Sequence, residues 1–240
     1  MATLNKKNGK VILPAKIKEF LQGKVMNEAD AKRTYATAIR VFERYHNQYE
    51  FPDNVEYNLG LLYDHRAMQL KRKSPQKATR LYQRAEDIYR AIIVRSPDFL
   101  FAHHGLARVL GEMKQYDEAI RHELWAHRLV QKLPKKMRGS LAVGSIFLTK
   151  GDYKNAEKWF LREVKELGSG DVGAVANVLM FYVKTKKYRK ALPYARRLER
   201  ILKKMGIVQK SGAQGDNKTI DMLFQRIQLA KRRVNKKTGS

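Results

Sequence analysis

Apolar residues recur every three or four positions along most of this chain, and short polar, glycine or proline-containing stretches interrupt them. This spacing places the apolar side chains on one face of an amphipathic helix. It predicts a first helix from about Asn27 to Gln48, then four helix pairs, and a last amphipathic helix over 218–235. The pattern therefore predicts an all-α fold.

Tyrosines followed three residues later by an alanine recur five times along the chain. Successive tyrosines of this kind are 47, 34, 37 and 35 residues apart. Self-similarity at such a period is typical of a helical solenoid, in which each unit buries its apolar face against its neighbours. The five pairs are Tyr35/Ala38, Tyr82/Ala85, Tyr116/Ala119, Tyr153/Ala156 and Tyr188/Ala191.

The four later helix pairs carry small residues and aromatics at corresponding places. The residues are Leu59-Gly60, Tyr63, Ala85 and Tyr89; Leu106-Ala107, Leu110 and Ala119; Val143-Gly144, Phe147, Ala156 and Phe160; Val178, Tyr182, Ala191 and Leu198. This pattern resembles the tetratricopeptide repeat over roughly 54–203, with Glu123, Glu163 and Ala195 as departures from it. The resemblance implies a right-handed α-solenoid, a tetratricopeptide-like superhelix of antiparallel helix pairs, with the last helix as a C-terminal cap.

The one long interval of the repeat indicates an insertion in the second pair. Because Ser74-Pro75 fits an N-cap followed by a first-turn proline, we expect the first helix to reach about Lys73 and the second to begin at Pro75. The result is an extended helical hairpin near 66–84 with a basic tip. The other predicted boundaries are a basic arm over 1–26, the repeat domain over 27–205, a loop over 206–217, the capping helix over 218–235 and a tail over 236–240.

The net charge and the lack of cysteine limit the partners and the cellular compartment expected for this protein. The formal net charge is +27, and the chain from Lys184 onward holds 18 lysines and arginines against three acidic residues. A small domain usually carries a net charge of about 2 to 8, so this excess must influence which partners it meets. The absence of cysteine excludes disulfides and thiolate metal sites and favours a reducing, cytoplasmic setting. The longest uncharged stretch, 172–183, is shorter than the ~20 residues of a membrane helix, so no integral membrane segment is expected.

The resemblance further implies that the first helices of the pairs line a concave groove for a partner. Carried over by position, the wall of the groove would hold Tyr57, Leu61, Asp64, His65, Phe101, His104, Arg108, Glu112, Arg138, Leu141, Ser145, Met180 and Lys184. The candidates for partner binding are Tyr57, His65, Phe101, His104, Arg108, Arg138 and Lys184. Of the positions with which some members clamp a peptide carboxyl terminus, only Arg138 is compatible here, so a peptide would be recognised differently. The alternative is that these residues are ordinary solvated helix positions.

Basic residues at the hairpin tip and on the last helix form a second candidate site. They are Lys71, Arg72, Lys73, Lys77, Arg226, Arg232 and Arg233. Such clusters can neutralise phosphates of a polyanion such as RNA, or they can serve solubility alone.

Catalytic and metal-binding patterns are missing from the sequence. There is no nucleophile elbow, phosphate-binding glycine loop or pair of carboxylates with catalytic spacing. Two of the six histidines, His122 and His127, are five residues apart and so face different sides of a helix. We therefore expect no metal site, no cofactor and no enzymatic activity.

These observations favour a non-catalytic adaptor that binds an acidic segment of a partner protein in its groove. The second hypothesis is an RNA- or ribosome-binding helical repeat protein that uses the hairpin tip and the last helix. A membrane-surface role for the basic last helix ranks third, and self-association into a homo-oligomer stays open.

Overall fold

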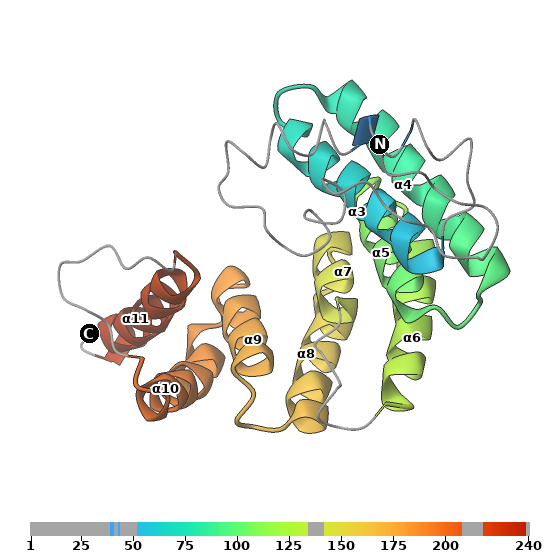
Figure 1. The fold of residues 1–240 in the computed structure, drawn as a ribbon. Coiled ribbons are helices and arrows are strands. Elements are labelled where there is room, and N and C mark those ends of the chain that lie inside the picture. The colour runs from blue at the N-terminus through green and yellow to red at the C-terminus, as the bar shows by residue number, and fades with distance from the viewer. Residues whose placement is uncertain (1–38, 41–42, 44–51, 134–141, 208–217, 239–240) are drawn as a thin grey trace. The chain divides into compact units, whose positions relative to one another are not determined.

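The computed structural model describes residues 39–40, 43, 52–133, 142–207 and 218–238. Every regular element within these ranges is an α-helix, which confirms the all-α prediction (Figure 1). The chain divides into two compact units, one ending at Leu129 and one beginning at Val130. Of the helix expected near the N-terminus, Ile39, Arg40 and Glu43 are described, and all three are helical. The basic arm over 1–26 lies outside the described residues.

The first unit contains two helix pairs. They are formed by α3 (Asp53–Leu70) with α4 (Pro75–Arg95), and by α5 (Leu100–Glu112) with α6 (Tyr116–Gln131). Helix α4 packs against both α3 and α5. Helix α3 ends at Leu70, a short turn follows over 71–73, and Ser74 precedes the first-turn proline of α4.

The second unit contains two further pairs and the last helix. The pairs are α7 (Val143–Lys150) with α8 (Tyr153–Leu167) and α9 (Val172–Lys184) with α10 (Tyr188–Lys204), and α11 (Lys218–Thr238) follows. Each helix packs against the next, and α11 contacts both α9 and α10. Its buried residues are Leu223, Phe224, Ile227 and Ala230, which join one apolar cluster with α8, α9 and α10. The loop residues 208–217 lie outside the described ranges.

Polar side chains and glycines fix several helix ends in the second unit. The carboxylate of Asp152 accepts a hydrogen bond from the Asn155 amide at the start of α8, and that of Asp171 accepts one from the Ala174 amide at the start of α9. These bonds satisfy amide groups that have no partner inside the helix. Helix α7 ends at Lys150, and the φ of 91° at the following Gly151 suits a residue without a side chain.

Glycines allow neighbouring helices to approach closely around large aromatic rings. A Cβ atom on Gly60 of α3 would lie 2.5 Å from the Tyr89 ring of α4, and one on Gly105 of α5 would lie 2.7 Å from the same ring. In the second unit, a Cβ on Gly144 of α7 would lie 2.9 Å from the Phe160 ring of α8. The small and aromatic residues of the repeat thus determine how closely the helices pack.

None of the described helices is both long and apolar enough to cross a membrane.

Candidate functional site

An aromatic cluster brings together two of the sequence-derived groove residues in the first unit. The ring of Tyr57 on α3 lies 5.8 Å from that of Phe101 on α5, between ring centroids, and 5.7 Å from that of Tyr89. Phe99 closes the cluster at 6.0 Å from both Tyr57 and Phe101. Phe101 is 55% exposed and Tyr57 is half-buried, so this cluster, the aromatic shelf, offers an apolar contact surface.

Arg108 is neutralised within the same unit. Its guanidinium forms an ion pair with Asp64, whose side chain is fully buried on α3. Burial raises the pKa of Asp64 to about 6, although the charge of Arg108 acts in the opposite direction. The guanidinium also lies 3.6 Å from the sulfur of Met68. The charge of Arg108 is therefore already paired with a carboxylate of the same chain, rather than left for a partner.

His104 makes a second internal pair beside the first. Its Nδ1 lies 2.9 and 3.0 Å from the two carboxylate oxygens of Glu123 on α6, and Glu123 is fully buried. The hydrogen bond to Glu123 raises the pKa of His104 against the effect of burial. Glu123 occupies a position at which the repeat usually has an aromatic residue. This departure from the pattern places a buried carboxylate against His104, one of the predicted groove residues.

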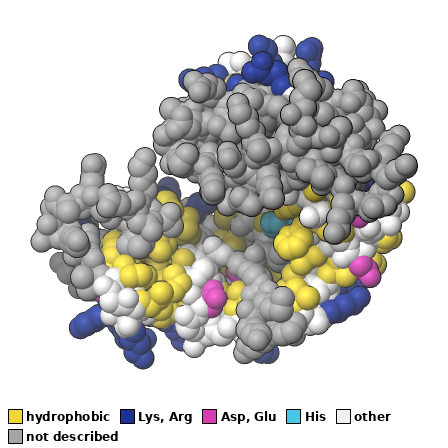
Figure 2. Space-filling model, viewed as in Figure 1, with side chains coloured by type: hydrophobic (Ala, Val, Ile, Leu, Met, Phe, Trp, Pro, Cys, Tyr) yellow, Lys and Arg dark blue, Asp and Glu magenta, His cyan; other side chains and the backbone are white. Residues whose placement is uncertain are grey.

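The other groove candidates of the first unit differ in their surroundings. His65 is exposed on α3. Glu112, at the end of α5, accepts a hydrogen bond from Lys71 Nζ at 2.5 Å and one from the Tyr82 hydroxyl at 3.5 Å. Lys71 is thus paired, whereas Arg72, Lys73 and Lys77 are exposed at the hairpin tip. Figure 2 shows lysine and arginine side chains gathered at the top of the view, over this hairpin. Arg138 and Leu141 lie outside the described residues.

A pocket of about 420 Å³ lies within the second unit and joins residues from four helices. Its lining residues are Ser145 and Leu148 of α7, Phe160 of α8, Asn177, Met180, Phe181 and Lys184 of α9, and Arg226 of α11. The sequence placed Lys184 in the groove and Arg226 in a separate polyanion site. The structure brings both cations to one pocket because α11 packs against α9.

Within the described part of the chain, the two cations of this pocket have no charged partner. Neither Lys184 nor Arg226 forms an ion pair with another described residue, whereas Asn177 is fixed by a hydrogen bond from its Nδ2 to Glu163 at 3.2 Å. The rings of Phe160 and Phe181 lie 5.4 Å apart and supply apolar lining, and Met180 is 36% exposed. The pocket therefore combines two positive charges with an apolar floor.

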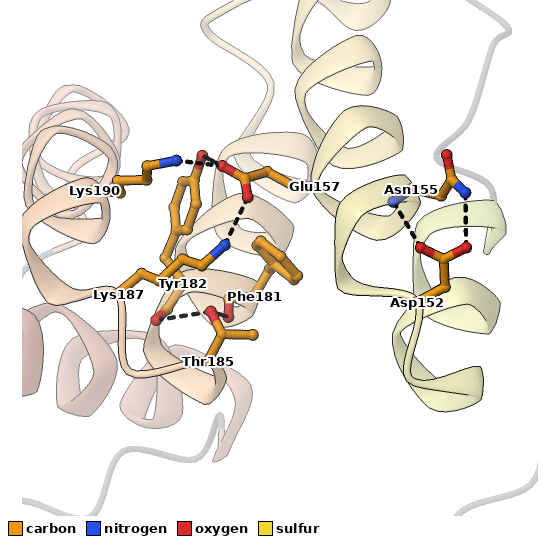
Figure 3. A network of polar contacts seen from close by, with 8 residues as sticks. All are labelled: Asp152, Asn155, Glu157, Phe181, Tyr182, Thr185, Lys187 and Lys190. Atoms are coloured by element: carbon orange, nitrogen blue, oxygen red, sulfur yellow. Dashed lines mark hydrogen bonds and ion pairs between the residues drawn. The ribbon is translucent and has the colours of Figure 1, made fainter.

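Other cations of the second unit are held by Glu157 on α8 (Figure 3). Its carboxylate accepts hydrogen bonds from Lys187 and Lys190, both at 2.8 Å, and from the Tyr182 hydroxyl at 3.0 Å. Burial acts against the ionised form, but these donors outweigh it and lower the pKa of Glu157 to about 2. Lys187 and Lys190 are thus largely neutralised on one side of the α9–α10 turn.

The remaining sequence-derived cations lie on α11. Arg232 and Arg233 are exposed, and the guanidinium of Arg233 lies 6.0 Å from the ring centre of Tyr188 on α10. Two histidines that were not candidates also meet in the first unit: the Nδ1 atoms of His103 and His122 are 3.0 Å apart. Among the described residues, no group of three or more histidine, aspartate or glutamate side chains is arranged to hold a metal ion.

Comparisons with known proteins bear on the fold. No protein-family model matches the chain, and no curated protein matches its sequence. A crystal structure of MamA is similar at a TM-score of 0.57 and 14% identity, over 82% of this chain and all of the other. A protein from Podosopora anserina described as a kinesin light chain with nearly identical TPR-like repeats is similar at 0.55 and 14% identity, over 82% and 100%.

A third similar structure is the APC/C hetero-tetramer Cut9-Hcn1, with a TM-score of 0.50 and 16% identity. It is matched over 88% of this chain and 34% of the other. At identities this low, structural similarity establishes the fold alone. It confirms the predicted arrangement of helix pairs in TPR-like repeats.

Proposed function

We propose that this divergent tetratricopeptide-like repeat protein is a non-catalytic scaffold that binds an acidic segment of a partner protein through its second unit. The TPR-like neighbours support protein binding in general. The observation that carries the finer proposal is the 420 Å³ pocket, in which Lys184 and Arg226 face an apolar floor without an acidic partner among the described residues.

The composition of the pocket suits a side chain or chain end that carries a carboxylate. Arg226 can donate two parallel hydrogen bonds to a carboxylate, and Lys184 adds a second positive charge. An apolar residue next to that carboxylate would cover Met180 and Phe181 and gain from removing their surface from water. The proposed ligand is therefore a peptide segment with acidic and apolar residues side by side.

The first unit contributes in a different way. Arg108 and His104 of this unit are paired with the buried residues Asp64 and Glu123, so they act mainly by holding α3, α5 and α6 together. Tyr57 and Phe101 of the aromatic shelf leave an apolar surface for a partner. Charge recognition is thus assigned to Lys184 and Arg226, and apolar contact to the shelf.

The comparisons give no support to the alternative in which RNA binds the hairpin tip and the last helix. In the first unit, the paired Lys71 also removes one of the cations on which that alternative relies.

Peptide binding measured by fluorescence anisotropy tests the proposal. The probes are labelled peptides of one length in which acidic and apolar residues are either adjacent, separated or replaced by basic residues. The native protein is expected to prefer the adjacent acidic and apolar pattern, and the Lys184→Glu/Arg226→Glu variant is expected to bind it at least about tenfold more weakly.

The matched control is Lys158→Glu/Lys165→Glu, which changes the net charge equally at exposed positions of α8. It is expected to retain the affinity for the preferred peptide within about twofold. Equal losses in both variants, or no preference among the peptides, would contradict the assignment of the pocket.

A further inference from the structure

The outward face of α10 carries a straight row of cations. Arg189, Arg196, Arg200 and Lys203 are spaced by seven, four and three residues, and all four are exposed. At 100° per residue these spacings keep the side chains within about 40° of one line along the helix. The opposite face is buried through Ala191, Ala195, Leu198 and Leu202. Blue side chains protrude over α10 at the lower left of Figure 2.

This row, the α10 stripe, is not neutralised by the acidic residues that the structure describes around it. Glu199 is the single acidic residue in the sequence of α10, and its carboxylate is bound by Lys231 of α11 at 2.6 Å. None of the four stripe residues forms an ion pair with a described residue. The stripe therefore presents four charges over 15 residues, which span about 21 Å along the helix.

A second concavity lies at the N-terminal end of the stripe. It measures about 550 Å³ and is lined by Lys186, Lys187, Tyr188, Arg189, Lys190, Arg233 and Val234. Glu157 holds Lys187 and Lys190, whereas Lys186, Arg189 and Arg233 form no ion pair with a described residue and are proposed to meet the ligand. Tyr188 is partly exposed within this ring of cations. Arg189 belongs to both features and makes the pocket continuous with the stripe.

We propose that the α10 stripe and this pocket bind single-stranded nucleic acid, with phosphates along the stripe and one unpaired base against Tyr188. Regularly spaced cations track a phosphate backbone, and an aromatic face stacks on any base. Because arginine offers a planar fork to phosphate, three arginines in the stripe favour this ligand over a simple point-charge contact.

The surroundings of α10 argue against the other polyanionic partners. A helix that lies on a membrane inserts its apolar face, but the apolar face of α10 is buried in the unit. An acidic protein segment would gain little apolar contact, because proline is the only uncharged residue exposed between the cations of the stripe. A nucleic-acid duplex hides the faces of its bases and would leave Tyr188 unused.

Fluorescence anisotropy with a labelled oligouridylate of about 15 nucleotides and its deoxythymidylate counterpart tests this inference in the full chain. Four phosphate contacts to a single strand give a slope of log affinity against log salt of about −3, so affinity is expected to fall about 50-fold between 50 and 200 mM salt. For Arg196→Ala/Arg200→Ala the slope is expected to lose about half its magnitude, with an affinity at 50 mM salt about tenfold lower or more.

Two further comparisons separate this site from general charge attraction. Lys158→Ala/Lys165→Ala removes the same charge from α8 and is expected to leave the affinity within about twofold. Tyr188→Leu keeps the apolar packing but removes the aromatic face, so binding is expected to weaken about fivefold or more, while Tyr188→Phe retains it. Circular dichroism of each variant verifies that the helices are intact.

Binding of either single strand with these variant effects supports the inference, and the two probes report any preference between RNA and DNA. Four results would overturn it: no binding at 50 mM salt, equal losses in the α8 control, tighter binding of a duplex of the same length, or phosphatidylserine vesicles that bind through the same arginines while the oligonucleotides do not. The inference is independent of the peptide pocket, because the stripe excludes Lys184 and Arg226.

Discussion

Replacement of Arg108 by alanine is expected to destabilise the first unit in a pH-dependent way. The guanidinium of Arg108 pairs with the buried carboxylate of Asp64, which would otherwise have its charge in apolar surroundings. Removal of one partner from a buried ion pair can lower the free energy of unfolding by about 3 to 5 kcal/mol when the remaining group stays ionised and buried. Asp64 can avoid this cost in part, because it can take up a proton and become neutral.

The pKa of Asp64 sets the magnitude. That pKa is about 6 in the native protein, mainly through burial, and loss of Arg108 raises it further because the guanidinium lowers it. A raised folded pKa means that stability is present at low pH and is lost as pH rises through the folded value. The native protein stops losing stability from this group above about pH 6, whereas the variant loses about 1.4 kcal/mol per pH unit up to its own, higher pKa. The difference between the two is expected to be small at pH 6 and to grow with pH, to an upper limit of about 3 kcal/mol at pH 8.

Urea unfolding followed by tryptophan fluorescence measures this difference. Trp125 lies on α6 and Trp159 on α8, so a Trp159→Phe background makes the signal specific for the first unit. The free energy of unfolding is determined from pH 6 to pH 8 with and without Arg108→Ala. The control is Arg108→Ala in an Asp64→Asn background, in which position 64 cannot ionise. Comparison of the two backgrounds isolates the part of the pH dependence that comes from Asp64, including the effects of Glu112 and His104 on it.

The reasoning fails if the cost of Arg108→Ala is independent of pH, or if it has the same pH dependence in the Asp64→Asn background. Unchanged stability together with lost peptide binding would instead make Arg108 a partner contact.

Two further predictions concern the packing and the acid stability of the first unit. Gly60→Ala is expected to lower the free energy of unfolding by about 1 to 3 kcal/mol, because its Cβ would overlap the Tyr89 ring, whereas Gly111→Ala in urea unfolding is expected to be neutral or stabilising because its Cβ would meet open space. Burial lowers the pKa of both His103 and His122, so their contribution to stability is present above about pH 6.5 and is lost as pH falls below it. Thermal unfolding at pH 7.5 and pH 5.0 is expected to show a drop in Tm that His122→Gln reduces, and an equal drop in that variant would refute the assignment.

The helix pairs were predictable because their signals are local. Each pair contains its own small residues and aromatics, and the contact between Gly144 and Phe160 lies within one repeat. The start of α4 at Pro75 was likewise indicated locally, by the Ser74-Pro75 dipeptide. The boundaries of the arm, the hairpin extension and the cap stay predictions.

The chemistry of the candidate site was less accessible, because it depends on residues far apart in the chain. Position in the repeat placed Arg108 and His104 in the groove, but it did not indicate that Asp64 and Glu123 would pair with them from other helices. Arg226 joins Lys184 only through the packing of α11 on α9. The α10 stripe did have a signal in the sequence, namely the spacing of its arginines by seven and four residues.

The position of the Tyr89 ring between two glycines has a consequence for how this protein can evolve. Gly60 approaches the ring from α3, closest to Cε1, and Gly105 approaches it from α5, closest to Cζ, so a single side chain belongs to two neighbouring repeats. A larger residue at either glycine is acceptable only if the ring is reduced, and a smaller residue at 89 leaves a cavity that both helices must fill. These three positions are therefore expected to vary together among relatives. Duplication or deletion of one helix pair at this place would separate Tyr89 from one of the two glycines, whereas an array of identical repeats would restore the same contact at the new junction.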